Sequence, residues 1–136
     1  ILEISETAAH ASVDIRYPVT KDYQWIFETA AKAAAAFGLE TTIPNRVDPL
    51  YIPEDQPLIQ RLKEAYESAT GEPCVLYSTG GGTYARHTNN RAVGFGPEFP
   101  GTIDNHAHNC NEQISLENFF THAQICLEAM YLLFTK

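Results

Sequence analysis

The sequence is poor in methionine and cysteine, and it has no long hydrophobic run. Three cysteines, Cys74, Cys110 and Cys126, are too few and too widely spaced for a disulfide framework or a Cys-x-x-Cys metal pair. No apolar stretch approaches the ~20 residues that a membrane helix needs. We therefore expect a protein of a reducing, cytoplasmic setting that has no membrane partner.

Positive charge is also scarce. The chain has 9 Lys and Arg against 17 Asp and Glu, which gives a formal net charge of −8. Such an acidic chain is a poor candidate for binding nucleic acid or an anionic membrane. Its 136 residues, 44% of them hydrophobic and 19% charged, are typical of a globular protein with room for one domain or two half-domains.

The sequence also lacks a methionine at its first position, which is Ile1. The only methionine is Met130, and Ile1 to Ile4 have the pattern of a strand interior, without the basic start of a signal peptide. We expect a fragment or a processed chain. Removal of an initiator methionine is the simpler alternative.

The hydrophobic pattern predicts alternating strands and helices. Period-two alternation predicts a strand over 11–16, and helical spacing predicts a helix from a Thr20 cap to Gly38. A short strand over 40–43 and a connection over 45–57 come next. A second helix, capped by Asp55 and stopped by Gly71, has the apolar stripe Leu58, Leu62, Ala65, Tyr66 and Ala69.

Short apolar runs predict two further strands, over 74–77 and 92–95, and a final helix follows a Ser115 cap. This order of elements indicates an α/β or α+β fold. On the final helix the residues of one face are predicted to be its apolar side: Leu116, Phe119, Phe120, Ala123, Leu127, Met130, Tyr131 and Phe134.

Three features could carry chemistry. Gly80, Gly81 and Gly82 allow a ligand to approach the backbone closely, although a structural turn is an equal reading. His106 and His108 could ligate a metal, although two loop histidines are more often solvated, and zinc needs three or four protein ligands.

The third feature is Arg16, on the polar face of the first predicted strand. A guanidinium presents a fork that matches the two oxygens of a carboxylate. The alternative is an ion pair at the rim with Asp14 or Glu3.

Four motifs together resemble a known family. They are Asp14 to Pro18, Ser78 to Arg86, the stretch from Phe95 to Gly101, and His108-Asn109-Cys110-Asn111-Glu112, in that order. The set resembles the C-terminal portion of the M20 metallopeptidases and is most similar to the PepV-type dipeptidases. The resemblance covers essentially the whole chain.

The resemblance implies a two-domain organisation. Residues 1–50 would be the C-terminal part of a ferredoxin-like lid domain, of a kind that commonly mediates dimer contacts. Residues 51–136 would be the C-terminal part of a zinc-peptidase-like α/β catalytic domain. A homodimer is compatible with this reading.

The resemblance also implies roles for particular residues. Arg16 matches the lid arginine that holds the C-terminal carboxylate of the substrate, and Gly81, Gly82 and Thr83 match a loop whose backbone contacts substrate. His108 matches the last ligand of a two-zinc site, for which cobalt or manganese could substitute, whereas His106 has no match. The other metal ligands and the general base would lie in an N-terminal half that this sequence lacks.

The expected function is therefore that of a C-terminal fragment of a cytoplasmic zinc dipeptidase, which hydrolyses dipeptides with a metal-activated water. The fragment alone would be inactive and would need the missing N-terminal half as its partner. A non-catalytic remnant that serves as an assembly or interaction domain is the alternative. An unrelated small α/β binding protein with a glycine-loop pocket is a third reading.

Overall fold

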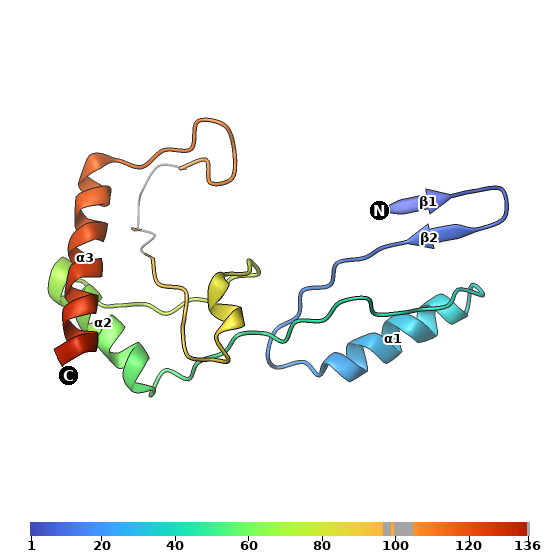
Figure 1. The fold of residues 1–136 in the computed structure, drawn as a ribbon, viewed down its shortest axis with the longest axis horizontal. Helices are drawn as coiled ribbons and strands as arrows, with labels where there is room; N and C mark the ends of the chain where they lie inside the picture. Colours follow the sequence, from blue (N-terminus) through green and yellow to red (C-terminus); the bar gives the residue numbers. More distant parts are fainter. Residues whose placement is uncertain (97–98, 100–104, 136) are drawn as a thin grey trace. The chain divides into compact units, whose positions relative to one another are not determined.

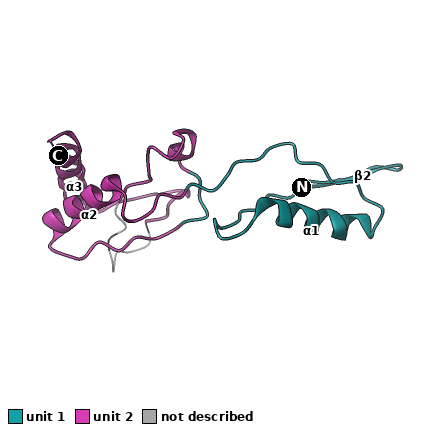
Figure 2. Cartoon of the chain, turned by 90° about the horizontal axis from the view of Figure 1, so that it is seen from below, with its two compact units in different colours: residues 1–50, 79–82 teal, residues 51–78, 83–136 magenta. Residues whose placement is uncertain are grey.

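A computed structural model describes residues 1–96, 99 and 105–135 and shows a mixture of helices and a small sheet (Figure 1). The chain divides into two compact units, residues 1–50 with 79–82 and residues 51–78 with 83–136 (Figure 2). The assignment of 1–50 to a lid domain and of 51–136 to a catalytic domain stays a prediction. Among the described residues, no helix combines the length and the apolar character needed to cross a bilayer.

The first unit begins with a β-hairpin. Strands β1 (Leu2–Ile4) and β2 (Ala9–Ala11) pair antiparallel, with Glu3 opposite His10. The turn between them is closed by Ser5, whose N–H donates to the Ala8 carbonyl at 2.7 Å and whose Oγ accepts from the Ala8 N–H at 3.0 Å. The strand pattern of the first residues is confirmed.

The first unit also contains α1 (Tyr23–Ala35), which ends near Gly38 as predicted. Its N-cap is Asp22 instead of Thr20, because the Asp22 carboxylate accepts from the Gln24 N–H at 2.8 Å. No residue of 1–50 or 79–82 is buried. This unit therefore has no hydrophobic core of its own within the described chain.

A polar cluster links the start of α1 to the segment that follows it. The Arg46 guanidinium lies 3.8 Å from the centre of the Tyr23 ring and pairs with Asp48, whose carboxylate also accepts from the Tyr17 hydroxyl. The hydrogen bond to Asp48 raises the pKa of Arg46, so this cation stays charged. The cluster is exposed, and its stabilising effect is correspondingly small.

The second unit contains a helix pair. Helix α2 (Pro57–Thr70) packs on α3 (Leu116–Thr135), and their contact forms the only core cluster among the described residues. Leu62 and Ala65 of α2 meet Ala129 and Leu132 of α3 there. A short 3-10 helix, η1 (Tyr84–His87), lies between α2 and α3 in sequence.

The ends of these helices largely follow the prediction. Ser115 caps α3, because its Oγ accepts from the Asn118 N–H at 3.1 Å, and Gly71 stops α2 in a left-handed conformation. Asp55 is not the N-cap of α2. That position is Gln56, which makes no side-chain cap bond and precedes Pro57 at the first turn, where a missing N–H costs nothing.

Gly71 offers a direct test of the backbone argument. Its φ is +72°, and no atom lies within 4 Å of an added Cβ. Gly71→Ala should therefore lower the free energy of unfolding by about 1 kcal/mol, because an L-residue is disfavoured in the left-handed region. Chemical denaturation measures this effect. Gly96→Ala should change stability little, because Gly96 is not in the left-handed region and an added Cβ would meet only His122 Cε1, at an ordinary 3.9 Å. An equal loss in both variants would contradict the explanation.

Four predicted strands are absent. The segments 11–16, 40–43, 74–77 and 92–95 form no ladder, apart from Ala11 at the end of β2. A strand exists only when a neighbour supplies hydrogen-bonding groups in register. Period-two alternation indicates that the side chains of a segment suit a sheet with one buried face. The described residues, however, provide no neighbouring strand that pairs with these segments.

The predicted apolar face of α3 is also not the face that packs. The buried residues are Ile125, Ala129 and Leu132, whereas Leu116, Phe119 and Phe120 are exposed. The helix is apolar on two opposite sides, so the sequence alone does not reveal which side meets α2. On α2, the prediction of Leu62 and Ala65 is confirmed and Ile59 was missed.

Candidate functional site

Arg16 and the glycine segment meet within the first unit. The Nη1 atom of Arg16 donates to the Gly80 carbonyl at 2.9 Å, across 64 positions of sequence. Its Nη2 atom lies 3.7 Å from the Asp14 carboxylate, and the two side chains are 65% and 77% exposed. The ion pair with Asp14, which was the alternative interpretation of Arg16, and the contact with Gly80 therefore exist together.

This arrangement leaves most of the guanidinium available. An arginine has five N–H donors, and the described structure commits one of them to Gly80 at short distance. The Asp14 contact is long and exposed, so it holds the side chain only weakly. The guanidinium is held by one hydrogen bond, and its other N–H groups are open to solvent. Such a guanidinium can donate two parallel hydrogen bonds to a carboxylate.

The side chain of Thr79 holds the glycine segment, Gly80 to Gly82, in a local turn. The Gly81 N–H donates to Thr79 Oγ1 at 3.1 Å, which closes a tight local turn. A Cβ on Gly80 would lie 3.9 Å from Arg16 Cδ, and one on Gly81 would lie 3.5 Å from Thr79 Oγ1. The family resemblance assigns substrate contacts to Gly81, Gly82 and Thr83, whereas the carbonyl that accepts from Arg16 is that of Gly80. The triple glycine drew attention to Gly80, but nothing in the sequence distinguished its carbonyl.

Thr83 belongs to the second unit and has a local role there. Its Oγ1 accepts from the Ala85 N–H at 3.3 Å and thereby caps η1. Its methyl group would lie 3.4 Å from a Cβ built on Gly94. Thr83 is thus held by backbone capping.

His108 lies on a loop that is closed by its own backbone. The Asn109 N–H donates to the His106 carbonyl at 2.8 Å, and the Gln113 N–H donates to the Asn105 carbonyl at 3.0 Å. Three non-glycine residues of this loop have left-handed backbones: His106 at φ 54°, His108 at φ 65° and Asn111 at φ 62°. Histidine and asparagine tolerate that region better than most residues, although at a cost in energy.

His108 is exposed, and its neighbours among the described residues do not surround it with further metal donors. In the described residues, no group of three or more His, Cys, Asp and Glu side chains is placed to hold a metal ion. A complete zinc site needs three or four protein ligands. The described residues therefore do not form a complete metal site, and His108 could supply one donor to a site completed from elsewhere.

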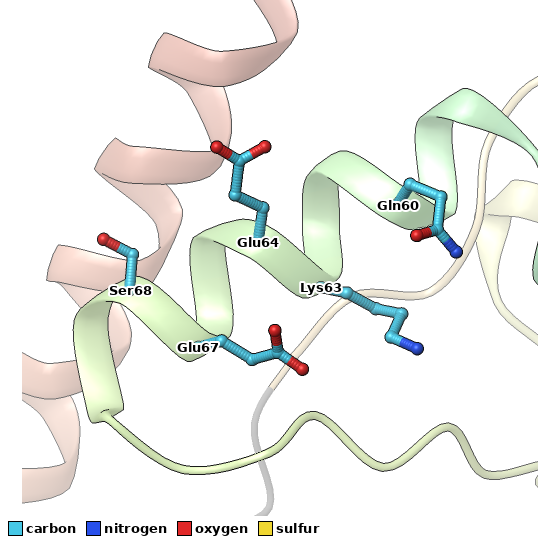
Figure 3. Close-up of a pocket in the computed structure, with 5 residues that line it drawn as sticks. All are labelled: Gln60, Lys63, Glu64, Glu67 and Ser68. Carbon is cyan, nitrogen blue, oxygen red and sulfur yellow. The ribbon is translucent and has the colours of Figure 1, made fainter.

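Other residues line a polar depression on α2. Gln60, Lys63, Glu64, Glu67 and Ser68 line it, and all five project from this one helix (Figure 3). Lys63 pairs with Glu54 before the helix, and Glu67 Oε1 accepts from the Cys74 N–H after it, at 3.0 Å. The hydrogen bond to Glu54 raises the pKa of Lys63. These contacts fasten α2 to its flanking segments, which is a structural role.

The thiols provide a separate test of the environment around α2. Burial raises the pKa of Cys74, and the nearby Glu67 carboxylate raises it further, whereas Cys110 is exposed. A raised pKa means less thiolate at a given pH, so at pH 8 Cys74 should react with iodoacetamide several-fold more slowly than Cys110. The difference between the two reaction rates should become smaller as the pH rises. Peptide mass spectrometry over time measures both rates, and equal rates at pH 8 would contradict this environment.

The chain is similar in sequence to several known proteins. The chain is 31% identical over 119 residues to a Staphylococcus haemolyticus protein named putative dipeptidase, across 88% of this chain and 25% of the relative. Two Staphylococcus aureus proteins of that name, from strains USA300 and NCTC 8325, are 31% identical over 127 residues, across 93% of this chain and 27% of each relative.

These matches cover nearly all of this chain but little of the relatives. The chain spans about a quarter of the length of the curated relatives that it matches. No protein-family model matches the chain. No solved structure matches it either.

Proposed function

We propose that this chain is the C-terminal part of a zinc-dependent dipeptidase of the M20, PepV-type class. The observation that carries the proposal is the similarity to proteins named putative dipeptidase over 88% to 93% of this chain. The contact between Arg16 and Gly80 supports it, because it places an open guanidinium beside a backbone that can approach a substrate.

In this proposal Arg16 binds the C-terminal carboxylate of the dipeptide. Its fixed donor to Gly80 orients the guanidinium plane, and the remaining donors form the fork that a carboxylate needs. The backbones of Gly81 and Gly82, with Thr83, contact the rest of the short substrate. A free carboxylate would thus be part of what the site recognises, which favours dipeptides over internal peptide bonds.

His108 is the one metal donor that we assign to this chain. Zinc, when bound, would supply an activated water for attack on the peptide carbonyl. The described residues cannot hold the ion alone. We therefore infer that the other ligands and the general base lie in the part of the longer protein that this sequence does not contain, and that cobalt or manganese could substitute for zinc.

The test is the intact mass of the natural protein, detected in source extract with an antibody against this chain and followed by a dipeptide assay. We expect a species several times heavier than 15.1 kDa that hydrolyses dipeptides in the presence of zinc. A heavier species that hydrolyses no dipeptide with zinc, cobalt or manganese would overturn the peptidase proposal. A species of 15.1 kDa would instead favour a non-catalytic assembly domain.

A further inference from the structure

Four polar and aromatic side chains of the first unit gather around the residue that follows Arg16. We call them the Tyr17 cluster: Tyr17, Tyr23, Arg46 and Asp48. Asp48 Oδ1 accepts from Arg46 Nε at 3.1 Å and from the Tyr17 hydroxyl at 3.5 Å. The Arg46 guanidinium lies 3.8 Å from the centre of the ring of Tyr23, the first residue of α1. Asp48 raises the pKa of Arg46 most and Tyr17 raises it further, so the three groups form one network.

Tyr17 is the fixed point of an otherwise exposed segment. It is half-buried, whereas every other residue between β2 and α1 is exposed. Pro18 biases the backbone of Tyr17 toward the extended region. In an extended backbone, consecutive side chains point to opposite sides. The contacts agree with this, because Arg16 reaches Gly80 and Tyr17 reaches Asp48.

The Arg16 side chain is therefore held at two places. Its guanidinium donates to the Gly80 carbonyl, and its backbone adjoins the residue that Asp48 holds. A long side chain that is already oriented loses less conformational entropy when a ligand binds. Removing the contact at Tyr17 should thus weaken carboxylate binding, although no group that contacts the carboxylate is lost.

The Tyr17 cluster is poorly placed to stabilise the fold as a whole. The side chains of Arg46 and Asp48 are 46% and 69% exposed, and ion pairs this exposed contribute little to the free energy of unfolding. No residue of the first unit is buried, so the cluster covers no core there. Its effect should appear in the orientation of Arg16 instead of in global stability.

We propose that Asp48 is a positioning residue for Arg16, which acts through Tyr17 and orients the guanidinium toward the substrate carboxylate. The carboxylate as ligand rests on the proposed function, whereas the orientation of Arg16 by Asp48 does not. Because Asp48 acts on binding and contacts no reacting atom, its loss should raise KM and leave kcat nearly unchanged.

The first experiment measures hydrolysis by the natural full-length protein that carries this sequence. Asp48→Ala should raise KM for a dipeptide about 5-fold and change kcat less than about 2-fold. KM for the same dipeptide with an amidated C-terminus should change little, because that substrate has no carboxylate for Arg16 to bind. The matched control is Glu40→Ala, which removes an exposed carboxylate of the same unit and should leave both KM values unchanged.

A second variant tests the connection through Tyr17. Tyr17→Phe removes only the hydroxyl that reaches Asp48, so it should raise KM for the free dipeptide about 3-fold. The double variant Tyr17→Phe with Asp48→Ala should be no worse than Asp48→Ala alone, because both changes break the same connection. Fully additive losses would contradict an action of Asp48 through Tyr17.

The second experiment needs no hydrolysis. Phenylglyoxal modifies arginine side chains, and peptide mass spectrometry gives the rate for each arginine. The rate at Arg16 should rise about 3-fold in Asp48→Ala, because a less ordered guanidinium leaves the Gly80 carbonyl more often. Arg91, an exposed arginine of the second unit, provides the internal reference and should keep its rate.

An unchanged rate at Arg16 would overturn the proposal, as would equal rises in KM for the free and the amidated dipeptide. A midpoint of thermal unfolding lowered by more than about 5 °C in Asp48→Ala would also overturn it, because the Tyr17 cluster would then be structural. If the unmodified protein hydrolyses no dipeptide, the proposed function fails, and the rate at Arg16 alone decides whether Asp48 positions it.

Discussion

Replacing His108 should reduce the proposed dipeptidase activity of the longer protein by more than about 100-fold. Loss of a residue that merely orients a metal ligand costs about 10- to 100-fold, and loss of a ligand itself should cost at least as much. The exposed imidazole of His108 is the donor that we assign to this chain, so no neighbouring side chain on its loop is expected to replace it. The measurement is kcat/KM for a dipeptide at saturating zinc, together with the zinc content of the purified variant.

The choice of substitution separates metal binding from loop folding. His108 has a φ of 65°, a region that asparagine tolerates and alanine does not. His108→Asn should therefore keep the loop and lose zinc, whereas His108→Ala also strains the backbone. The matched control is His106→Asn, at φ 54° in the same loop, which should retain both zinc and activity. Equal losses from the two asparagine variants would contradict the assignment of His108.

Replacing Arg16 should have the second-largest effect. Arg16→Ala removes the proposed partner of the substrate carboxylate, and loss of one partner of a charge pair typically costs several kcal/mol. We expect KM for a dipeptide to rise about 100-fold, with a smaller change in kcat, because the lost contact is made equally before and during the reaction. Arg16→Lys should recover only part of the loss, since an ammonium cannot form the planar fork.

A substrate whose terminal carboxylate is blocked distinguishes loss of carboxylate binding from general damage to the protein. A dipeptide amide has no terminal carboxylate, so the unmodified protein should already bind it poorly, and Arg16→Ala should change its KM little. Asp14→Asn provides the structural control, because it removes the negative charge of the 3.7 Å ion pair and leaves the hydrogen bond to Gly80. If Arg16→Ala weakens binding of the amide and the free dipeptide equally, the carboxylate role is wrong.

The helices were the predictable part of the fold. Gly38 and Gly71 stop α1 and α2, and Ser115 begins α3, because these positions depend on interactions within a few residues. The predictions that failed depend on distant partners. The strand over 11–16 matched period two, but the pairing in the structure joins Leu2–Ile4 to Ala9–Ala11 instead.

The face of α3 illustrates the same limit. The helical period correctly places Phe120, Leu127 and Phe134 on one side of α3, and the structure leaves that side exposed. The opposite side, with Ile125 and Leu132, is buried. Both sides satisfy the helical period. Which side meets α2 depends on shape complementarity between two helices, and periodicity contains no information about it.

The candidate site was predictable in its residue types but not in its contacts. The fork of Arg16 and the conformational freedom of the glycines were evident from the sequence, whereas the hydrogen bond between Arg16 and the Gly80 carbonyl spans 64 positions and required the fold. The roles of Arg16, Gly81, Gly82, Thr83 and His108 in substrate and metal binding stay predictions.

The most direct test of a zinc dipeptidase is a metal titration of the longer natural protein. The protein is stripped with a chelator, and hydrolysis of an unblocked dipeptide is followed as zinc is returned. We expect negligible hydrolysis without metal and recovery at about two zinc ions per chain, with no recovery in His108→Asn. Hydrolysis that persists in the stripped protein, or that never appears with zinc, cobalt or manganese, would contradict it.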